Sequence, residues 1–390
     1  MVKLIIMRLI YFLVTLFILS EYSISRAEVS MNSSVDIAGV HRNYAHGSSH
    51  YDLFLDPSIS TKYNSANWTV EGKLQLRHLQ SRSNRDKNDW SYVSLVPAER
   101  LLSLGLDLSN EGSDQQTYLD IASLWIGYDI GDVQISLGRK ALGIGVLMAF
   151  PVWNRLYPVV PSASGYLFHN NPDLVDVRWQ KNSIGLAAYH IFSKDNERQL
   201  SSFEFTHYGE NLESHILLGK WWDQTISGYT GVLDTSLGIF RLESLFILEN
   251  DDLEGGTQFG VGYERAFTED LSFLVEYYYS SFGADKSENY LTNNQNPFRV
   301  LLAKQYVFPQ VTYKPTDLSS VRLGSLVNLI DESTLIQLKL DYSLADNKTI
   351  DLTIQKPLGA KGDEFGYLPY LAGVNLEYAQ FISANFRMTF

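Results

Sequence analysis

The residues best suited to chemistry in this sequence are charged side chains that recur at every second position of extended segments. In WTVEGKLQLRHL, for example, Glu71 and Lys73 alternate with apolar residues such as Val70. Because successive side chains of a strand point to opposite faces, each segment places its charges on one face. The charged face predicted in this way comprises Glu71, Lys73, Arg77, Asp176, Arg178, Glu243, Glu264, Glu276, Lys339, Asp341 and Arg387. Rings of fixed charge suit the passage of ions and polar solutes. Any one of these charges could instead serve only to solvate and cross-link the inner wall of the protein.

Two further groups of side chains could hold a metal ion. The first is the acidic run of ENDDLEGG, with Asn250, Asp251, Asp252 and Glu254. Oxygen ligands suit calcium, but the spacing matches no EF-hand, and a solvated loop accounts for it better. The second is the histidine set His41, His46 and His50. Disorder of that polar segment explains the set better than a metal site, so we assign no metal and no cofactor.

Enzymatic chemistry has little support in the sequence. The chain has no cysteine, which excludes a disulfide framework, a thiolate metal site and a catalytic thiol. We find neither a nucleophile elbow nor a HExxH zinc motif. The formal charge of -13 also argues against nucleic acid as a partner. We expect a protein that is not an enzyme.

The elements that must position the charges are strands. Apolar and polar residues alternate with period two in LIQLKLDYSL and TIDLTIQK, and we find no convincing amphipathic helix beyond the N-terminal segment. Short turns alternate with longer, more polar joins through most of the chain. This asymmetry is typical of barrels with short periplasmic turns and long outer loops. We therefore predict an all-β fold, a transmembrane up-and-down antiparallel β-barrel of about 18 strands, with 16 as the alternative.

The two ends of the chain add information about export and assembly. Residues 1–27 combine Lys3 and Arg8, an apolar run and a small-x-small exit at Ala27, which together indicate a secretory signal peptide. Export together with the predicted barrel places the protein in the cell outer membrane. Residues 28–65 fit no strand well and are predicted to be a periplasmic lead or a plug, and residues 66–390 are predicted to be the barrel. Strands of this barrel are predicted near 90–96 and 100–108, among others.

The chain ends in FISANFRMTF, an alternating segment whose last residue is Phe390. A free terminus gains nothing from apolar residues unless it is docked, so we predict that the last strand pairs with the first. Phe386, Met388 and Phe390 resemble the terminal signal of Gram-negative outer-membrane barrels. That resemblance implies recognition by the barrel-assembly machinery, and outer-membrane lipid and lipopolysaccharide as neighbours.

The longest join, residues 141–173, contains four prolines and several aromatic residues. Long ordered loops are usually functional. One hypothesis is that this join folds into the lumen and narrows it, with Trp153, Arg155 and Tyr157 near the constriction. The other is that it caps the barrel outside and packs on neighbouring loops.

The run VQISLGRKALGIGV, followed by Pro151, is similar to the strand and proline-containing loop of alginate-export-like and related porin-like barrels. Lys140 stands where glutamine is common in that pattern, and the aspartate usual shortly after the proline is missing. The resemblance implies a transport-type barrel and names no substrate.

These observations favour a porin-like channel for diffusion of small hydrophilic solutes or ions. An outer-membrane adhesin or structural surface barrel is the alternative, and a barrel enzyme or a secreted β protein are further ones. The sequence predicts neither the solute, the ion selectivity nor the oligomeric state.

Overall fold

The computed structural model describes most of the chain beyond residue 27. The described residues are 28–43, 49–81, 105–108, 115–143, 145–150, 152–153, 171–194, 199–251, 253–290, 298–299, 301–369, 375–377 and 380–390.

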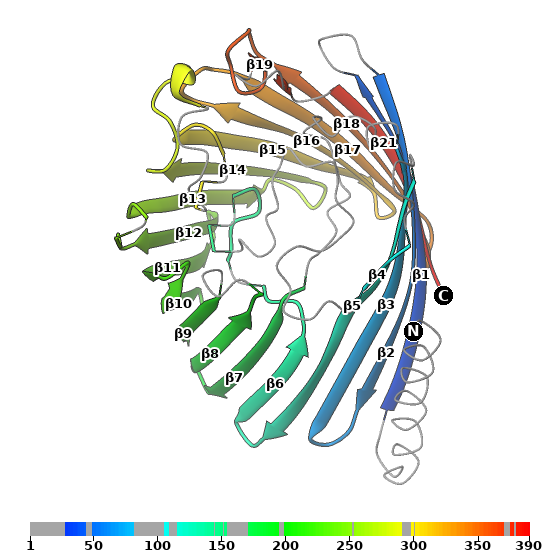
Figure 1. Ribbon diagram of the computed structural model, residues 1–390, viewed down its shortest axis with the longest axis vertical. Coiled ribbons are helices and arrows are strands. Elements are labelled where there is room, and N and C mark those ends of the chain that lie inside the picture. Colours follow the sequence, from blue (N-terminus) through cyan, green and yellow to red (C-terminus); the bar gives the residue numbers. More distant parts are fainter. Residues whose placement is uncertain are drawn as a thin grey trace.

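Eighteen antiparallel strands of the described chain form one closed ring (Figure 1). In chain order they are β1 (Glu28–Asn43), β2 (Ser49–Asn64), β3 (Trp68–Ser81), β5 (Gln115–Ile130), β6 (Val133–Arg139), β7 (Asp173–Lys181), β8 (Ile184–Phe192), β9 (Leu200–Tyr208), β10 (Leu212–Trp221), β11 (Gln224–Thr235), β12 (Gly238–Ile247), β13 (Gly256–Ala266), β14 (Leu271–Ser280), β15 (Gln305–Thr316), β16 (Ser319–Asn328), β17 (Thr334–Ala345), β18 (Lys348–Leu358) and β21 (Gln380–Thr389). Each strand pairs with its neighbours along this order. The predicted fold class and strand number are confirmed.

The ring closes where the last strand meets the first. β21 lies between β18 and β1, with a register on β1 that runs from Ser34 opposite Thr389 to Asn43 opposite Gln380. Figure 1 shows the blue first strand beside the red last one. The last residue takes part, because the Phe390 N–H donates to the Ser33 carbonyl at 2.8 Å. The apolar C-terminus is therefore docked in the sheet, as the alternation predicted.

The two ends of the barrel differ. At one end, short turns such as residues 131–132 and 182–183 connect the strands, and Gly131 and Asn182 adopt φ of 58° and 53°. Positive φ is what tight two-residue hairpins require. At the other end the connections include the longer segments 140–172 and 281–304. The predicted asymmetry of the joins is present.

Residues 28–65 correct the sequence analysis. They form β1 and β2, two full strands of the barrel, so the prediction of a periplasmic lead or plug is wrong. Apolar residues on both faces hide the alternation, since Ala38 and Phe54 are buried inside while Ile37 and Leu55 are exposed outside. Pro57, which has no N–H to donate, also interrupts the ladder to β3 and reads as a strand breaker.

The strands expected near 90–96 and 100–108 are corrected as well. Residues 82–104 lie outside the described residues. β3 pairs directly with β5, which leaves no place between them for two strands of the ring. Among the described residues 105–108, β4 (Leu106–Asp107) pairs with β5 opposite Leu119 and Tyr118. The total of eighteen is right because β1 and β2 replace the two expected strands.

Little else of the described chain is regular. β19 (Tyr367–Pro369) and β20 (Asn375–Glu377) form a separate two-stranded ladder, and η3 (Ser287–Asn289) is one turn of 3-10 helix. No helix among the described residues is long and apolar enough to cross a membrane.

The two faces of the barrel wall have opposite chemistry. The outer face carries exposed apolar side chains around the ring, such as Leu53, Val177, Leu218, Leu242 and Leu323. The inner face carries buried polar and charged side chains, together with an apolar cluster against which loop residues pack. A soluble β-protein would have the reverse arrangement, with its apolar face inside and its polar face in water.

The closing seam can be tested by a disulfide, because the chain has no native cysteine. Ser34 and Thr389 are directly opposed, and a directly opposed pair of this kind has Cα atoms within disulfide range. We expect Ser34→Cys with Thr389→Cys to oxidise to a cross-linked chain, seen as a reductant-sensitive mobility change on denaturing gels.

The matched control is Ser34→Cys with Thr349→Cys. Thr349 lies on β18, one strand further from β1, where two strand spacings of about 4.8 Å exceed disulfide reach. Cross-linking of the control pair but not the test pair would contradict the seam.

Candidate functional site

The inner wall holds all of the predicted charged face. The strand register places the eleven residues, from Glu71 on β3 to Arg387 on β21, opposite the exposed apolar face. Arg77, Asp176, Glu243 and Glu276 are buried there, whereas the Arg387 side chain is 58% exposed. The structure thus places these side chains together on one surface, and their role in lining a channel stays a prediction.

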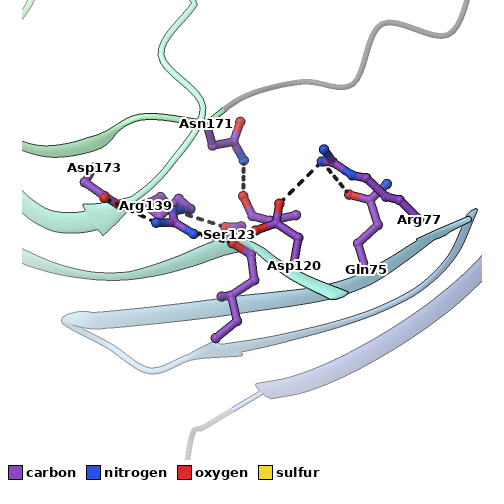
Figure 2. A network of polar contacts seen from close by, with 9 residues as sticks. Gln75, Arg77, Asp120, Ser123, Arg139, Asn171 and Asp173 are labelled. Carbon is purple, nitrogen blue, oxygen red and sulfur yellow. Dashed lines mark hydrogen bonds and ion pairs between the residues drawn. The ribbon is translucent and has the colours of Figure 1, made fainter. Parts of the chain in front are cut away.

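Four charged side chains on neighbouring strands form a continuous network (Figure 2). Asp120 of β5 lies 3.4 Å from Nη2 of Arg77 and 3.7 Å from Nη1 of Arg139. Arg139 also contacts both carboxylate oxygens of Asp173, with Nε and Nη2 at 2.9 and 3.2 Å. Such paired contacts fit the planar fork of a guanidinium. The network joins β3, β5, β6 and β7 side by side on the wall.

A glycine lets β6 turn two side chains that lie an odd number of positions apart toward the inner wall. Ser136 donates to Asp176 at 2.5 Å, and Arg139 reaches Asp173, although strict alternation would send these two side chains to opposite faces. Gly138, between them, adopts φ of 130°, and a Cβ there would lie 2.3 Å from the Leu124 carbonyl oxygen. Only glycine fits this backbone, which turns the end of β6 inward.

A β-bulge on β5 has a similar effect. Lys73 pairs with Ser123 and Leu74 pairs with Ile121, so Ala122 is an extra residue opposite β3. The carbonyl of Ile121 accepts a hydrogen bond from Arg139 Nη1 at 2.8 Å. The bulged Ala122 carbonyl accepts one from Asn171 Nδ2 at 2.7 Å. The irregular backbone is thereby satisfied by the network and the adjoining loop.

Ion pairs continue along the rest of the wall. Asp176 accepts from Lys140 at 2.8 Å and from Arg178 at 3.0 Å. Further pairs are Arg241 with Glu264 at 2.6 Å, Arg322 with Asp341 at 2.6 Å, Lys339 with Asp341 at 3.3 Å, and Arg387 with Asp36 at 2.5 Å. Paired charges of both signs therefore surround the interior.

A segment of the long join 140–172 lies inside the ring and is held there by two glutamates. The Glu243 carboxylate accepts the backbone N–H groups of residues 146, 147 and 153. The Glu276 carboxylate accepts those of Met148 and Ala149 at 2.7 Å and of Phe150 at 3.2 Å. Two buried carboxylates thus receive six backbone donors. We call residues 145–150 and 152–153 the inserted segment.

Apolar packing holds the same segment. Leu147, Phe150, Val152 and Trp153 are buried in one cluster with inward residues of the wall and with loop residues such as Phe298. Glycines make room for this contact, because a Cβ on Gly260 would lie 2.3 Å from Leu147 Cδ1. The Phe150 ring also stacks on Tyr278 with centroids 5.2 Å apart. The inserted segment is a packed part of the barrel interior.

The residues predicted for a constriction are placed only in part. Trp153 lies in the inserted segment against β12, and its Nε1 donates to the Ser244 carbonyl at 2.8 Å. Arg155 and Tyr157 lie outside the described residues. Of the two hypotheses for this join, the described portion agrees with the one that placed it in the lumen.

The two candidate metal groups take ordinary roles where they are described. The Asn250 carboxamide oxygen accepts the Leu253 N–H at 2.7 Å and so closes a turn, and Asp252 lies outside the described residues. His41 hydrogen-bonds Ser49 Oγ at 2.9 Å and stacks on Tyr51. Within the described chain, no group of three or more His, Cys, Asp or Glu side chains could hold a metal ion.

Sequence reasoning missed several members of the charged wall. Asp120 lies beside the bulge on β5, and Asp173 is the first residue of β7. Period-two alternation gives no guidance at either place. Arg42 and Asp52, a buried ion pair, lie on the strands that were taken for a lead. Arg139 had a usable signal, since it follows the special glycine in the run VQISLGRK.

Comparisons with known proteins agree with this fold. No family model and no curated protein matches the chain. Among solved structures, the chain is similar to Pseudomonas aeruginosa OccK5 (OpdH), at 9% identity and a TM-score of 0.59, with 93% of this chain and 98% of that one covered. It is also similar to Acinetobacter baumannii OccAB2, at 10% identity and a TM-score of 0.57, with 93% and 98% covered. These structures are outer-membrane porins, so the chain has a porin-like barrel fold.

The network around Asp120 gives a stability prediction. Asp120→Asn leaves the buried Arg77 and Arg139 near each other without their shared carboxylate. Removing one partner of a buried ion pair costs about 3–5 kcal/mol. We therefore expect the free energy of unfolding of the refolded barrel, measured in urea, to fall by that order.

The matched control is Asp129→Asn, on the same strand near the short turn. Its carboxylate accepts from Gln134 Nε2 at 2.9 Å and is partly exposed, so its loss should cost about 1 kcal/mol. Equal effects of the two substitutions would contradict the network.

Proposed function

We propose that this protein is an outer-membrane channel for the diffusion of small hydrophilic solutes or ions. The observation that carries the proposal is a closed ring of eighteen strands with an apolar outer face and a charged inner wall.

Closure suits a membrane because the hydrocarbon offers no partner to an unpaired backbone group. In the ring, every strand has a hydrogen-bonded neighbour on both sides, including β1 and β21 at the seam. Exposed apolar side chains on the outer face, such as Leu218 and Leu323, are then solvated by lipid rather than left in water.

Outward aromatic pairs near both ends support the same placement. Trp68 and Tyr128 lie next to short turns, with ring centroids 4.3 Å apart. Phe259 and Tyr279 lie near the long-loop end, with centroids 5.2 Å apart. Aromatic residues gather at the two interfaces of a membrane, where their rings meet the headgroups.

The inner wall supports a polar path. Its paired charges offer partners to ions and polar solutes, and a partly exposed subset, Glu264, Lys339 and Asp341, forms its ion pairs with other side chains of the wall. The inserted segment occupies part of the interior beside β12 and β14, so it is the candidate that narrows the path. The residues proposed at the constriction remain Trp153, Arg155 and Tyr157.

The cellular setting belongs to the same proposal. Residues 1–27 would act as an export signal removed after Ala27, and β1 begins at Glu28. Phe386, Met388 and Phe390 would be read by the barrel-assembly machinery, and lipid and lipopolysaccharide would surround the outer face. No observation in the described chain favours an adhesin or an enzyme over a channel.

Conductance tests the proposal directly. We expect the purified mature protein, added in detergent to a planar bilayer, to produce discrete and long-lived current steps in concentrated salt. Asymmetric salt would then report through the reversal potential whether acidic or basic wall residues dominate. Stable insertion without any steps would overturn the channel.

The two anchoring glutamates give a second prediction. A hydrogen bond to a charged acceptor contributes about 1.5–3 kcal/mol, so Glu243→Gln with Glu276→Gln should release the inserted segment. We expect a higher average single-channel conductance with rapid fluctuations added to it.

The control for this experiment is Glu264→Gln. Glu264 lies on the same part of the wall but contacts Arg241 rather than the inserted segment. Conductance that is unchanged in the double variant, or changed equally in the control, would show that the inserted segment does not narrow the path.

A further inference from the structure

Three connections at the long-loop end meet in a cluster of polar side chains outside the strands. Residues 281–304 contribute Tyr290, residues 329–333 contribute Asp331, and residues 359–366 contribute Glu364. The Asp331 carboxylate accepts the Tyr290 hydroxyl at 2.8 Å and the Glu364 N–H at 2.7 Å. One aspartate therefore ties the three connections together.

Glu364 is the deeply buried carboxylate of this cluster, with only 1% of its surface exposed. Its carboxylate accepts the Tyr306 hydroxyl, Asn328 Nδ2 at 2.8 Å and the Leu302 N–H at 3.2 Å. Tyr306 and Asn328 belong to β15 and β16. The carboxylate thus joins a loop to the barrel wall.

Tyr306 connects this cluster to the inserted segment. Its hydroxyl donates to Glu364 and accepts the Ala303 N–H at 2.6 Å, while its ring lies 6.3 Å from the Phe150 ring. The Phe150 N–H in turn donates to Glu276. A chain of direct contacts therefore runs from Glu364 to the backbone of the inserted segment.

We propose that Glu364 is a positioning residue for the inserted segment, acting through Tyr306 and Phe150. If the protein is the channel proposed above, the arrangement of the loops at this end sets how far the inserted segment narrows the interior. Only this consequence rests on the proposed function. The contacts themselves do not depend on that function.

The proposal predicts a dependence on pH. Burial, aided by the nearby Asp331, raises the pKa of Glu364 from 4.5 to about 7. The packed arrangement therefore binds the proton more tightly than an open one, so its stability falls as pH rises from about 4.5 to about 7 and stays low above that. The other titratable and charged groups facing Glu364 are Asp331, Tyr290, Tyr306 and Arg299; burial raises the pKa of Tyr290, which remains a donor.

Hydrogen exchange of the full protein in detergent tests the proposal without any current. We expect the amides of Met148, Ala149 and Phe150, corrected for intrinsic rates, to exchange about 10-fold faster or more at pH 8 than at pH 5. Amides of β14 serve as the reference for global opening. Glu364→Gln and Tyr306→Phe should both abolish the difference, the second while keeping the aromatic ring.

Glu332→Gln is the matched control, because Glu332 is exposed in the neighbouring connection. It should behave as the wild type. A wild type with equal protection at both pH values, or a Glu364→Gln protein that keeps the difference, would overturn the positioning role. A barrel that carries no current but shows the exchange difference would overturn only the channel.

Discussion

Backbone pairing across the seam between β1 and β21 is the interaction on which the rest of the structure depends. A wall surrounded by lipid must leave no strand edge open, since each unpaired group there costs several kcal/mol. The first and last described strands pair to form this seam, and the Phe390 N–H itself donates to the Ser33 carbonyl. Once the ring is closed, the period of two sets the face of each residue wherever the strands are regular, because each residue must face either the outer surface or the interior.

The interior is organised by the cost of burying charge. Arginines and carboxylates on the wall occur in contact, as in the network of Arg77, Asp120 and Arg139, because an unpaired buried ion is expensive. Glu243 and Glu276 are compensated differently, by backbone N–H groups of the inserted segment. The requirement that every buried charge has a partner thus explains both the ion pairs of the wall and the inward position of the inserted segment.

Regular alternation, with the alternation of short and long joins, was enough to predict the all-β class, the antiparallel barrel and the inward face of residues such as Glu243 and Glu276, whereas the total of eighteen strands came out right because two missed strands offset two that the ring does not contain. It failed where the backbone is irregular or both faces are apolar. Ala38 and Phe54 hid two whole strands, and the bulge at Ala122 and the turn at Gly138 changed which side chains face inward. The contacts of the inserted segment link residues about a hundred positions apart, and no local pattern encodes them.

The seam also has a consequence for how the chain comes to be folded. Asp36 and Arg387, which meet there, are 351 positions apart, so the last contacts of the ring join the most distant parts of the sequence. Contacts between residues so far apart form slowly, because the entropy of closing a very long loop is lost before the contacts stabilise the chain. Until the final strand arrives, β1 keeps an open edge that any other extended chain could occupy. Synthesis of a complete chain is thus a condition for a closed wall, and a truncated product would be left with an adhesive edge that cellular proteases and chaperones could detect.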